Sequence, residues 1–505
     1  MAARAVAIIA AALLAALTFG PLAIVLAWAE GFQGLRAADW QALRFTLWQA
    51  VLSAGFSCLL AVPVARALAR RRFWGRGALI TLLGAPFILP VIVAVMGLLA
   101  VFGQSGVVNS LLRALGLGTV DIYGLHGVVI AHVFFNLPLA VRILLQGWLA
   151  IPEERFRLAA SLGLRPLAMA MTLEWPLIRR VLPGAFAIIF VICLTSFAVA
   201  LTLGGGPRAT TVELAIYQAM RFDFDPGRAA MLAVIQLAVG IAAGVLALRL
   251  ARAEGFGTGL DRAVPRHDGA SQAARLWDAG WLVAASGFLL VPLVMVIWRG
   301  LPGLVALDAG TLRAAGHSLA IALGSTALCL AWALPLAGRR VAVVSLASIA
   351  ISPLVLGTGL FLLLRPVVNP FDMALPVTTV VNALMALPFA LRILAPEAEA
   401  TRRDFARLRA TLRLTGLAWV RFVWLPRLRR PMGFAAGLTA ALAMGDLGVI
   451  ALFADPDRAT LPLQVYRLMG SYRMEDAAGA ALLLMGLSLA LFWAFDKGGR
   501  VRAAD

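Results

Sequence analysis

Long apolar runs separated by shorter polar segments follow one another along the whole chain. Each run is about 20 residues long, the length that an α-helix needs to cross a bilayer, whereas a membrane β-strand would alternate over about ten residues. The pattern predicts an all-α integral membrane protein with about 12 transmembrane helices in a lipid bilayer. The predicted spans are 6–28, 46–67, 78–102, 124–147, 181–203, 229–250, 279–298, 316–337, 341–364, 375–394, 431–453 and 477–495.

The chain contains the same pattern twice. Residues 157–180 (RLAASLGLRPLAMAMTLEWPLIRR) align without a gap with residues 407–430 (RLRATLRLTGLAWVRFVWLPRLRR), and the spans before them match in the same register. We therefore predict two homologous six-helix halves. An even number of spans in each half makes the repeats parallel, related by an axis along the membrane normal. The expected divisions are a first transmembrane domain, a polar linker and a second transmembrane domain, at 1–252, 253–275 and 276–505.

The charge is strongly basic, with a net value of +19 from 44 Lys and Arg residues against 25 Asp and Glu residues. About three quarters of the basic residues, but only about half of the acids, fall in the segments on the N-terminal side of the spans, which is the bias of cytoplasmic loops. We therefore expect both termini and both repeated segments to be cytoplasmic. Because orientation explains the basic charge, no nucleic-acid partner is implied.

The two repeated segments, 152–180 and 402–430, are too polar to cross a membrane. Pro152 suits a helix start, and the acids Glu153 and Glu154 suit its first turn. We predict two short helices with a bend at Gly163, the second ending at Pro176. Such helices could simply lie on the lipid surface. Their duplication instead favours a docking element for a two-fold symmetric partner.

The first copy resembles the EAA loop of ABC importer permeases, a pattern of two alanines, a glycine and a later Leu-Pro. It reads RLAASLG over 157–163 and continues to Trp175-Pro176; the second copy has Arg413 in the position of the glycine but keeps Leu425-Pro426. In that family the loop couples the permease to an ATP-hydrolysing subunit. The resemblance implies the same role here for Arg157, Ala159, Ala160, Gly163, Pro176, Arg407, Ala410, Arg413 and Pro426.

The resemblance extends to the permeases of bacterial thiamine and thiamine pyrophosphate ABC importers. It is clearest in LTLGGGPRATTVELAIYQAMRFDFDPGRAAML, residues 201–232, together with the duplicated layout. It implies an inner-membrane permease that receives thiamine from a periplasmic binding protein and associates with two copies of a cytoplasmic ATPase.

No sequence pattern for catalysis is present. A P-loop requires a lysine that reaches the phosphates, and the only lysine is Lys497, in the unrelated context DKGGR. The cysteines and histidines are scattered, with no metal-ligand spacing. We expect no enzyme activity, no cofactor and no metal in this chain, and we expect ATP and magnesium on the partner ATPase.

Polar residues inside the spans are candidates for a substrate path, because their burial in a membrane is costly. Asp446 lies in a span, and Ser196 and Phe197 lie at or next to the position 250 residues earlier. An acid beside an aromatic ring would attract a cationic, aromatic molecule such as thiamine. The alternative is an Asp446 that caps a helix or pairs with an arginine. Asn136, one turn from His132, could line the path or make an interhelical hydrogen bond.

Three further acids, Glu213, Asp223 and Asp225, are expected on the opposite side from the repeated segments. They could contact a binding protein or simply be solvated. Other functions also remain open at this point: a ferric-iron ABC importer permease, a 12-helix secondary transporter and a membrane scaffold without transport. A secondary transporter would need a coupling-ion site, and Asp446 is the one plausible buried acid for it in the sequence.

Overall fold

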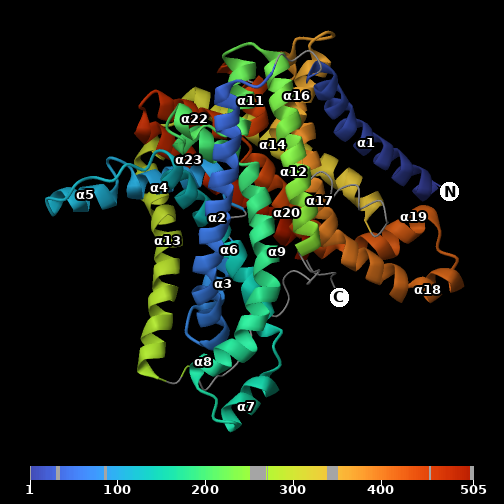
Figure 1. The fold of residues 1–505 in the computed structure, drawn as a ribbon. Helices are drawn as coiled ribbons and strands as arrows, with labels where there is room; N and C mark the ends of the chain where they lie inside the picture. The colour runs from blue at the N-terminus through green and yellow to red at the C-terminus, as the bar shows by residue number, and fades with distance from the viewer. Residues whose placement is uncertain are drawn as a thin grey trace.

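The computed structural model describes residues 2–29, 34–84, 88–250, 269, 271–337, 351–453 and 456–500. These residues form helices and loops and contain no strand, which confirms the all-α prediction. Eleven helical segments among them are long and apolar enough to cross a membrane. The predicted span 341–364 is described only from residue 351 onward, where the 12-residue helix α16 lies (Figure 1).

The first half contains twelve α-helices in the described residues. They are α1 (Ala2–Ala29), α2 (Ala37–Arg70), α3 (Arg76–Leu82), α4 (Val91–Phe102), α5 (Val107–Ala114), α6 (Leu125–Leu149), α7 (Glu153–Ser161), α8 (Pro166–Met169), α9 (Trp175–Leu194), α10 (Phe197–Leu203), α11 (Val212–Arg221) and α12 (Pro226–Leu250).

The second half repeats this order. Its helices are α13 (Gln272–Val305), α14 (Ala309–Leu336), α16 (Pro353–Leu364), α17 (Ala374–Asp404), α18 (Ala406–Thr411), α19 (Gly416–Trp419), α20 (Leu425–Met444), α21 (Gly448–Phe453), α22 (Leu461–Gly470) and α23 (Met474–Arg500). Helix α13 begins at Gln272, inside the expected linker 253–275, most of which falls outside the described residues.

Three of the predicted spans are not continuous. The span 78–102 is divided into α3, which ends at Leu82, and α4, which begins directly after Pro90, a residue with a non-helical ψ of 137°. The spans 181–203 and 431–453 are each interrupted near their ends, at Thr195–Ser196 and at Gly445–Leu447. These two interruptions fall at equivalent positions of the repeat.

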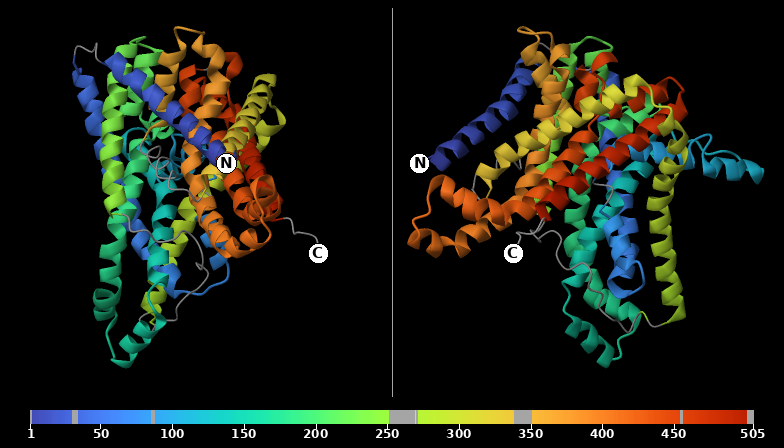
Figure 2. Two further views of the ribbon diagram at one scale, coloured as in Figure 1. Left: turned by 90° about the vertical axis from the view of Figure 1, so that its right-hand side faces the viewer. Right: turned by 180° about the vertical axis from the view of Figure 1, so that it is seen from behind.

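The first helix of each half packs against the other half. Helix α1 lies on α14 and α16, and α13 lies on α2 and α4, on opposite sides of the molecule (Figures 1 and 2). Both contacts are made at a glycine. A methyl group on Gly97 would collide with the backbone of Pro292, and one on Gly359 would collide with the backbone of Pro21. Each first helix also packs on its own half, α1 on α12 and α13 on α23, so these two helices bridge the halves.

A buried ion pair also joins the halves. The Nε atoms of Arg70 and Arg71, at the end of α2, each lie 2.6 Å from Asp278 on α13. The side chains of Arg70 and Asp278 are only 3% exposed. Removing one partner of such a pair leaves an uncompensated buried charge and costs about 3–5 kcal/mol.

Candidate functional site: two equivalent loops and a central seam

The first repeated segment folds as a bent pair of short helices. Helix α7 ends at a turn in which Gly163 has a φ of +64°, and the N–H groups of Gly163 and Leu164 donate to the carbonyls of Ala160 and Ala159, each at 3.0 Å. The chain then enters α8 at Pro166. This turn is the left-handed helix end that glycine adopts at low cost.

The second copy bends in the same way without a glycine. Arg413 has a φ of +47°, and the N–H groups of Arg413 and Leu414 donate to Ala410 and Arg409 at 3.3 and 3.1 Å. A side chain other than glycine is strained in this conformation by roughly 1–2 kcal/mol. The turn is thus preserved in both copies although only one of them has the favoured residue.

Both loops present exposed side chains at equivalent positions. Leu158 and Leu162 on the first loop are 60% and 66% exposed, and Leu408 and Leu412 on the second are 42% and 58% exposed. Exposed leucines at the tips of arginine-rich loops suit a protein partner with an apolar cleft. The loops lie at the bottom and at the lower right of Figure 1, with the two halves diverging between them.

The predicted coupling residues have different environments within these loops. Arg157 is exposed and donates to Glu153 at 2.8 Å, and this hydrogen bond with its charge raises the pKa of Arg157 above its usual value. Ala159 is buried, and Ala160 is partly buried. The remaining candidates are exposed: Gly163, Pro176, Arg407, Ala410, Arg413 and Pro426.

The prediction that Pro176 ends the second short helix is wrong. Residues 166–194 form one continuous helical run, in which the π-helical turn Ala170–Glu174 joins α8 to α9. The same turn recurs at Val420–Trp424, before Pro426. Because proline cannot donate a helical hydrogen bond, a wider turn just before it lets the helix continue without a break.

Different contacts hold the two loops in place. In the first, the buried carboxylate of Glu174 accepts hydrogen bonds from Arg66 Nε at 2.8 Å and Trp148 Nε1 at 3.1 Å. The sequence analysis did not identify Glu174 as a residue that holds the loop. An acid inside a mostly basic segment could have drawn attention to it, but its partners are far away in the chain.

The second loop has an aromatic residue, Trp424, at the position of Glu174. Its contacts are arginines stacked over aromatic rings. Arg402, Arg409 and Arg427 lie 4.7, 5.1 and 4.9 Å from the ring centres of Trp424, Trp419 and Phe405.

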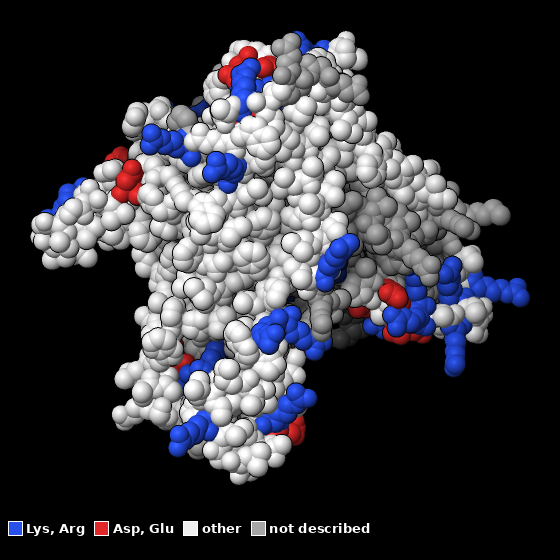
Figure 3. Space-filling model, viewed as in Figure 1, with Lys and Arg blue, Asp and Glu red and all other residues white. Residues whose placement is uncertain are grey.

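Arginines gather on the surface of both loops. In Figure 3 the basic atoms cluster at the bottom and the lower right, over these segments, while the surface between them and the top of the view is mostly uncharged. This distribution fits the predicted division into membrane-embedded and polar parts.

The central seam between the halves is formed by the two helix interruptions. Ser196, at the start of α10, and Asp446, before α21, are both partly buried. Phe197 is buried and reaches across to the other half: a methyl group on Gly448 would lie 3.7 Å from its Cδ1 atom and 3.8 Å from Asp446 Oδ1. The structure thus places Phe197, the neighbour of Ser196 in the chain, beside the segment that contains Asp446.

Asp446 combines two features that the sequence analysis treated as alternatives. Its Oδ1 atom accepts a hydrogen bond from the N–H of Gly448 at 3.2 Å and so caps α21. Its Oδ2 atom is buried and makes no well-aligned hydrogen bond to a described residue, and the side-chain amide of Asn382 is its polar neighbour. Asp446 therefore caps a helix and also keeps a buried carboxylate oxygen at the junction of the halves.

Asn136 lies on α6 and contacts Cys193, one turn before the interruption at Thr195–Ser196. Its amide donates to His132 O at 2.8 Å and lies 3.5 Å from Cys193 Sγ, while His132 Nδ1 lies 3.1 Å from Ser53 Oγ. These contacts correspond to the hydrogen-bonded packing that was the alternative to a path-lining role.

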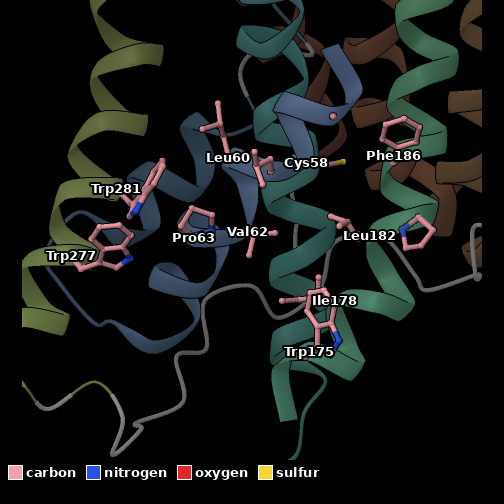
Figure 4. Close-up of a pocket in the computed structure, with 13 residues that line it drawn as sticks. Cys58, Leu60, Val62, Pro63, Trp175, Ile178, Leu182, Phe186, Trp277 and Trp281 are labelled. Atoms are coloured by element: carbon pink, nitrogen blue, oxygen red, sulfur yellow. The ribbon is translucent and has the colours of Figure 1, made fainter. Parts of the chain in front are cut away.

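A groove of about 830 Å³ opens between α2, α9 and α13 (Figure 4). Its lining includes Cys58, Pro63, Trp175, Trp277 and Trp281, and is almost entirely apolar. A groove of this composition suits lipid chains, because its lining is apolar and carries no charged side chain. It is distinct from the seam at Asp446.

Comparison with known proteins gives full-length relatives. The chain is 42% identical to the thiamine transport system permease protein ThiP of Brucella abortus, covering 98% of this chain and 95% of that protein. It is 42% identical to ThiP of Salmonella typhimurium and 41% identical to ThiP of Escherichia coli, each over 91% of this chain and 89% of the relative.

A molybdenum transport system permease protein, ModB of Azotobacter vinelandii, is 32% identical over only 35% of this chain and 78% of its own length. No protein-family model matches the chain. The similarity over the whole length therefore lies with the thiamine permeases.

Proposed function

This chain belongs to the family of bacterial thiamine transport system permease proteins, and we propose that it forms the membrane path through which an ATP-driven importer moves thiamine or thiamine pyrophosphate into the cell. The chain is a multi-pass inner-membrane transport component. The observation that carries the proposal is the pair of loops with the same left-handed turn, at Gly163 and Arg413, which lie at the bottom and at the lower right of Figure 1.

The two loops are the docking sites for the ATPase. Each offers a short helix with exposed leucines, at Leu158 and Leu162 or at Leu408 and Leu412. Two equivalent sites on one chain call for two copies of the ATPase, which would bind ATP and magnesium. On this proposal both loops and both termini are cytoplasmic, as the arginine bias favours.

The substrate path follows the seam between the halves. Ser196, Phe197 and Asp446 face it from the two helix interruptions, and a periplasmic binding protein would deliver thiamine from the opposite side. Thiamine carries a permanently cationic thiazolium ring, which an acid and an aromatic face attract without requiring tight binding. ATP-driven motion of the loops would open the seam to either side in turn.

Two alternatives have less support. A ferric-iron permease would need hard oxygen ligands along its path, and no group of three or more His, Cys, Asp or Glu residues that could hold a metal occurs in the described ranges. A secondary transporter leaves the paired docking loops unexplained, and the full-length relatives are permeases of thiamine transport systems.

The test is uptake of labelled thiamine at nanomolar concentration by cells that lack their own importer. The cells express the chain with its binding protein and its ATPase, in active and inactive form. We expect accumulation that requires the active ATPase. Accumulation that survives the inactive ATPase but collapses with the proton gradient would overturn the proposal in favour of a secondary transporter.

Loss of accumulation while the ATPase still co-purifies with the chain would overturn the substrate alone. Labelled ferric iron would then be tested in the same cells. Failure of the ATPase to co-purify would overturn the docking role of the loops.

A further inference from the structure

Glu213 is a buried acid that the loops and the seam described so far do not use. It lies in the first turn of α11 with a relative exposure of 1%, so neither alternative considered from sequence, a surface contact or a solvated side chain, fits it. Both carboxylate oxygens are buried and make no well-aligned hydrogen bond to a described residue. Its polar neighbours are Gln236 on α12 and Ser352 at the start of α16.

Ser352 and Gln236 are within hydrogen-bonding reach of Glu213, but no basic side chain among the described residues faces it, and a buried carboxylate without a counter-charge is costly. Burial of a charge is tolerated when a counter-charge or a full set of hydrogen bonds compensates it. Acids inside membrane proteins characteristically face the path of a substrate or an ion. Helix α11 of the first half packs here against α16 and α21 of the second, so Glu213 lies at the junction of the halves.

A chain of aromatic contacts connects Glu213 to the seam at Asp446. Tyr217 is one turn beyond Glu213 on the same face of α11 and is also buried. Its ring meets that of Phe197 edge to face, with 5.3 Å between the ring centres. Phe197 in turn packs against Gly448, beside Asp446. Two acids therefore flank one pair of aromatic rings.

The two acids are not copies of each other. The position equivalent to Glu213 in the second half is Pro462, and the position equivalent to Asp446 in the first half is Ser196. Each half therefore contributes one carboxylate, at a different place in the repeat. Such an arrangement suits a single asymmetric molecule better than two identical ones.

We propose that Glu213 and Tyr217 complete a binding site for the cationic heteroaromatic part of the substrate, together with Phe197 and Asp446. This inference rests on the proposed function. The aromatic pair stacks with the thiazolium and pyrimidine rings, and the two carboxylates attract the positive charge of the thiazolium ring. The site is closed in this structure and opens when the halves part along the seam.

The test uses the assembled importer in proteoliposomes, with the binding protein and the ATPase. Uptake of thiamine and of thiamine diphosphate is measured for the wild type, Glu213→Gln, Glu213→Asp, Tyr217→Phe and Tyr217→Leu. ATP hydrolysis stimulated by the loaded binding protein is measured in parallel. Asp496→Asn, which changes an ion-paired acid in the last turn of α23, is the matched control.

We expect Glu213→Gln to lower the rate of thiamine uptake about tenfold, because one charged partner is lost. Uptake of the anionic diphosphate should fall less, so the ratio of the two rates should change. Stimulated ATP hydrolysis should persist, and Glu213→Asp should recover part of the uptake. Tyr217→Phe should keep the uptake that Tyr217→Leu loses.

An unchanged rate ratio in Glu213→Gln, with wild-type thiamine uptake, would overturn the inference while leaving the proposed function intact. If Glu213→Gln fails to assemble, the tyrosine pair decides: equal uptake by Tyr217→Phe and Tyr217→Leu overturns the site. If the wild-type importer itself moves no thiamine, it is the proposed function that fails.

Discussion

The two arginine-rich loops share one backbone conformation but are held by different chemistry. In the first, α6 ends at Leu149 and α7 is a separate helix, and the carboxylate of Glu174 holds the loop through its hydrogen bond from Arg66. In the second, α17 runs without interruption to Asp404, and arginines stacked on aromatic rings replace the carboxylate. A duplicated fold can therefore preserve a shape while the interactions that support it are exchanged.

This difference changes how each loop should respond to the substitution of a single residue. The first depends on one buried acid that receives two directional hydrogen bonds. The second distributes its support over three exposed or half-exposed contacts, each of which is weaker. We therefore expect the first loop to be sensitive to single substitutions and the second to be tolerant of them.

The largest expected effect is that of Glu174→Gln. The change removes the negative charge that Arg66 faces, and we expect a loss of about 3 kcal/mol in stability, the lower end of the cost of breaking a buried ion pair. Thermal unfolding of the purified chain measures the loss, and co-purification of the ATPase reports on the loop. Arg427→Gln, which removes the stack on Phe405, is the matched change in the second loop, and an equal loss from it would contradict the comparison.

An intermediate effect is expected at the left-handed turns. Gly163→Val should destabilise the first loop by about 1–2 kcal/mol, because a β-branched residue is strained at positive φ. Arg413→Gly should have the opposite sign and stabilise the second by up to about 1 kcal/mol.

Gly77→Val is the control for the turn variants, since Gly77 has open space around it and no positive φ. Thermal unfolding and thiamine uptake would be measured for all three. A destabilising Arg413→Gly would show that the arginine side chain, and not the turn, is what the second loop requires.

The smallest effects are expected from the outer charges of the loops. Arg409→Gln removes a half-exposed stack on Trp419, worth about 0.5–1 kcal/mol. Arg157→Gln removes only a solvent-exposed pair with Glu153, for which we expect no measurable change in unfolding. If Arg157→Gln nevertheless abolishes ATPase co-purification, the residue acts in docking and not in the stability of the loop.

Much of this architecture could be predicted from the sequence because it depends on short stretches of neighbouring residues and on the internal repeat. The apolar runs gave the helices, and the match of 157–180 to 407–430 gave the equivalence of the loops. The 250-residue offset likewise paired Asp446 with Ser196, but the sequence did not show that each of them lies at a helix interruption.

The tertiary partners could not be predicted in the same way. Gly97 and Gly359 lie in apolar runs of the sequence. Their neighbours in the sequence do not indicate that Pro292 and Pro21 of the opposite half pack against them. The burial of Glu213 depends on α16, whose sequence is more than a hundred residues away. The continuation of the helix through Pro176 depends on a wider turn that composition does not reveal.

The packing of α1 and α13 against the opposite half has a mechanical consequence. Because α1 and α13 each pack on both halves, any tilt of one half against the other must shift the contacts of these two helices. A rocking motion that begins at one loop must pull on a helix belonging to the other half. Helices α1 and α13 therefore couple the two halves mechanically, so that a movement started at either loop affects both halves.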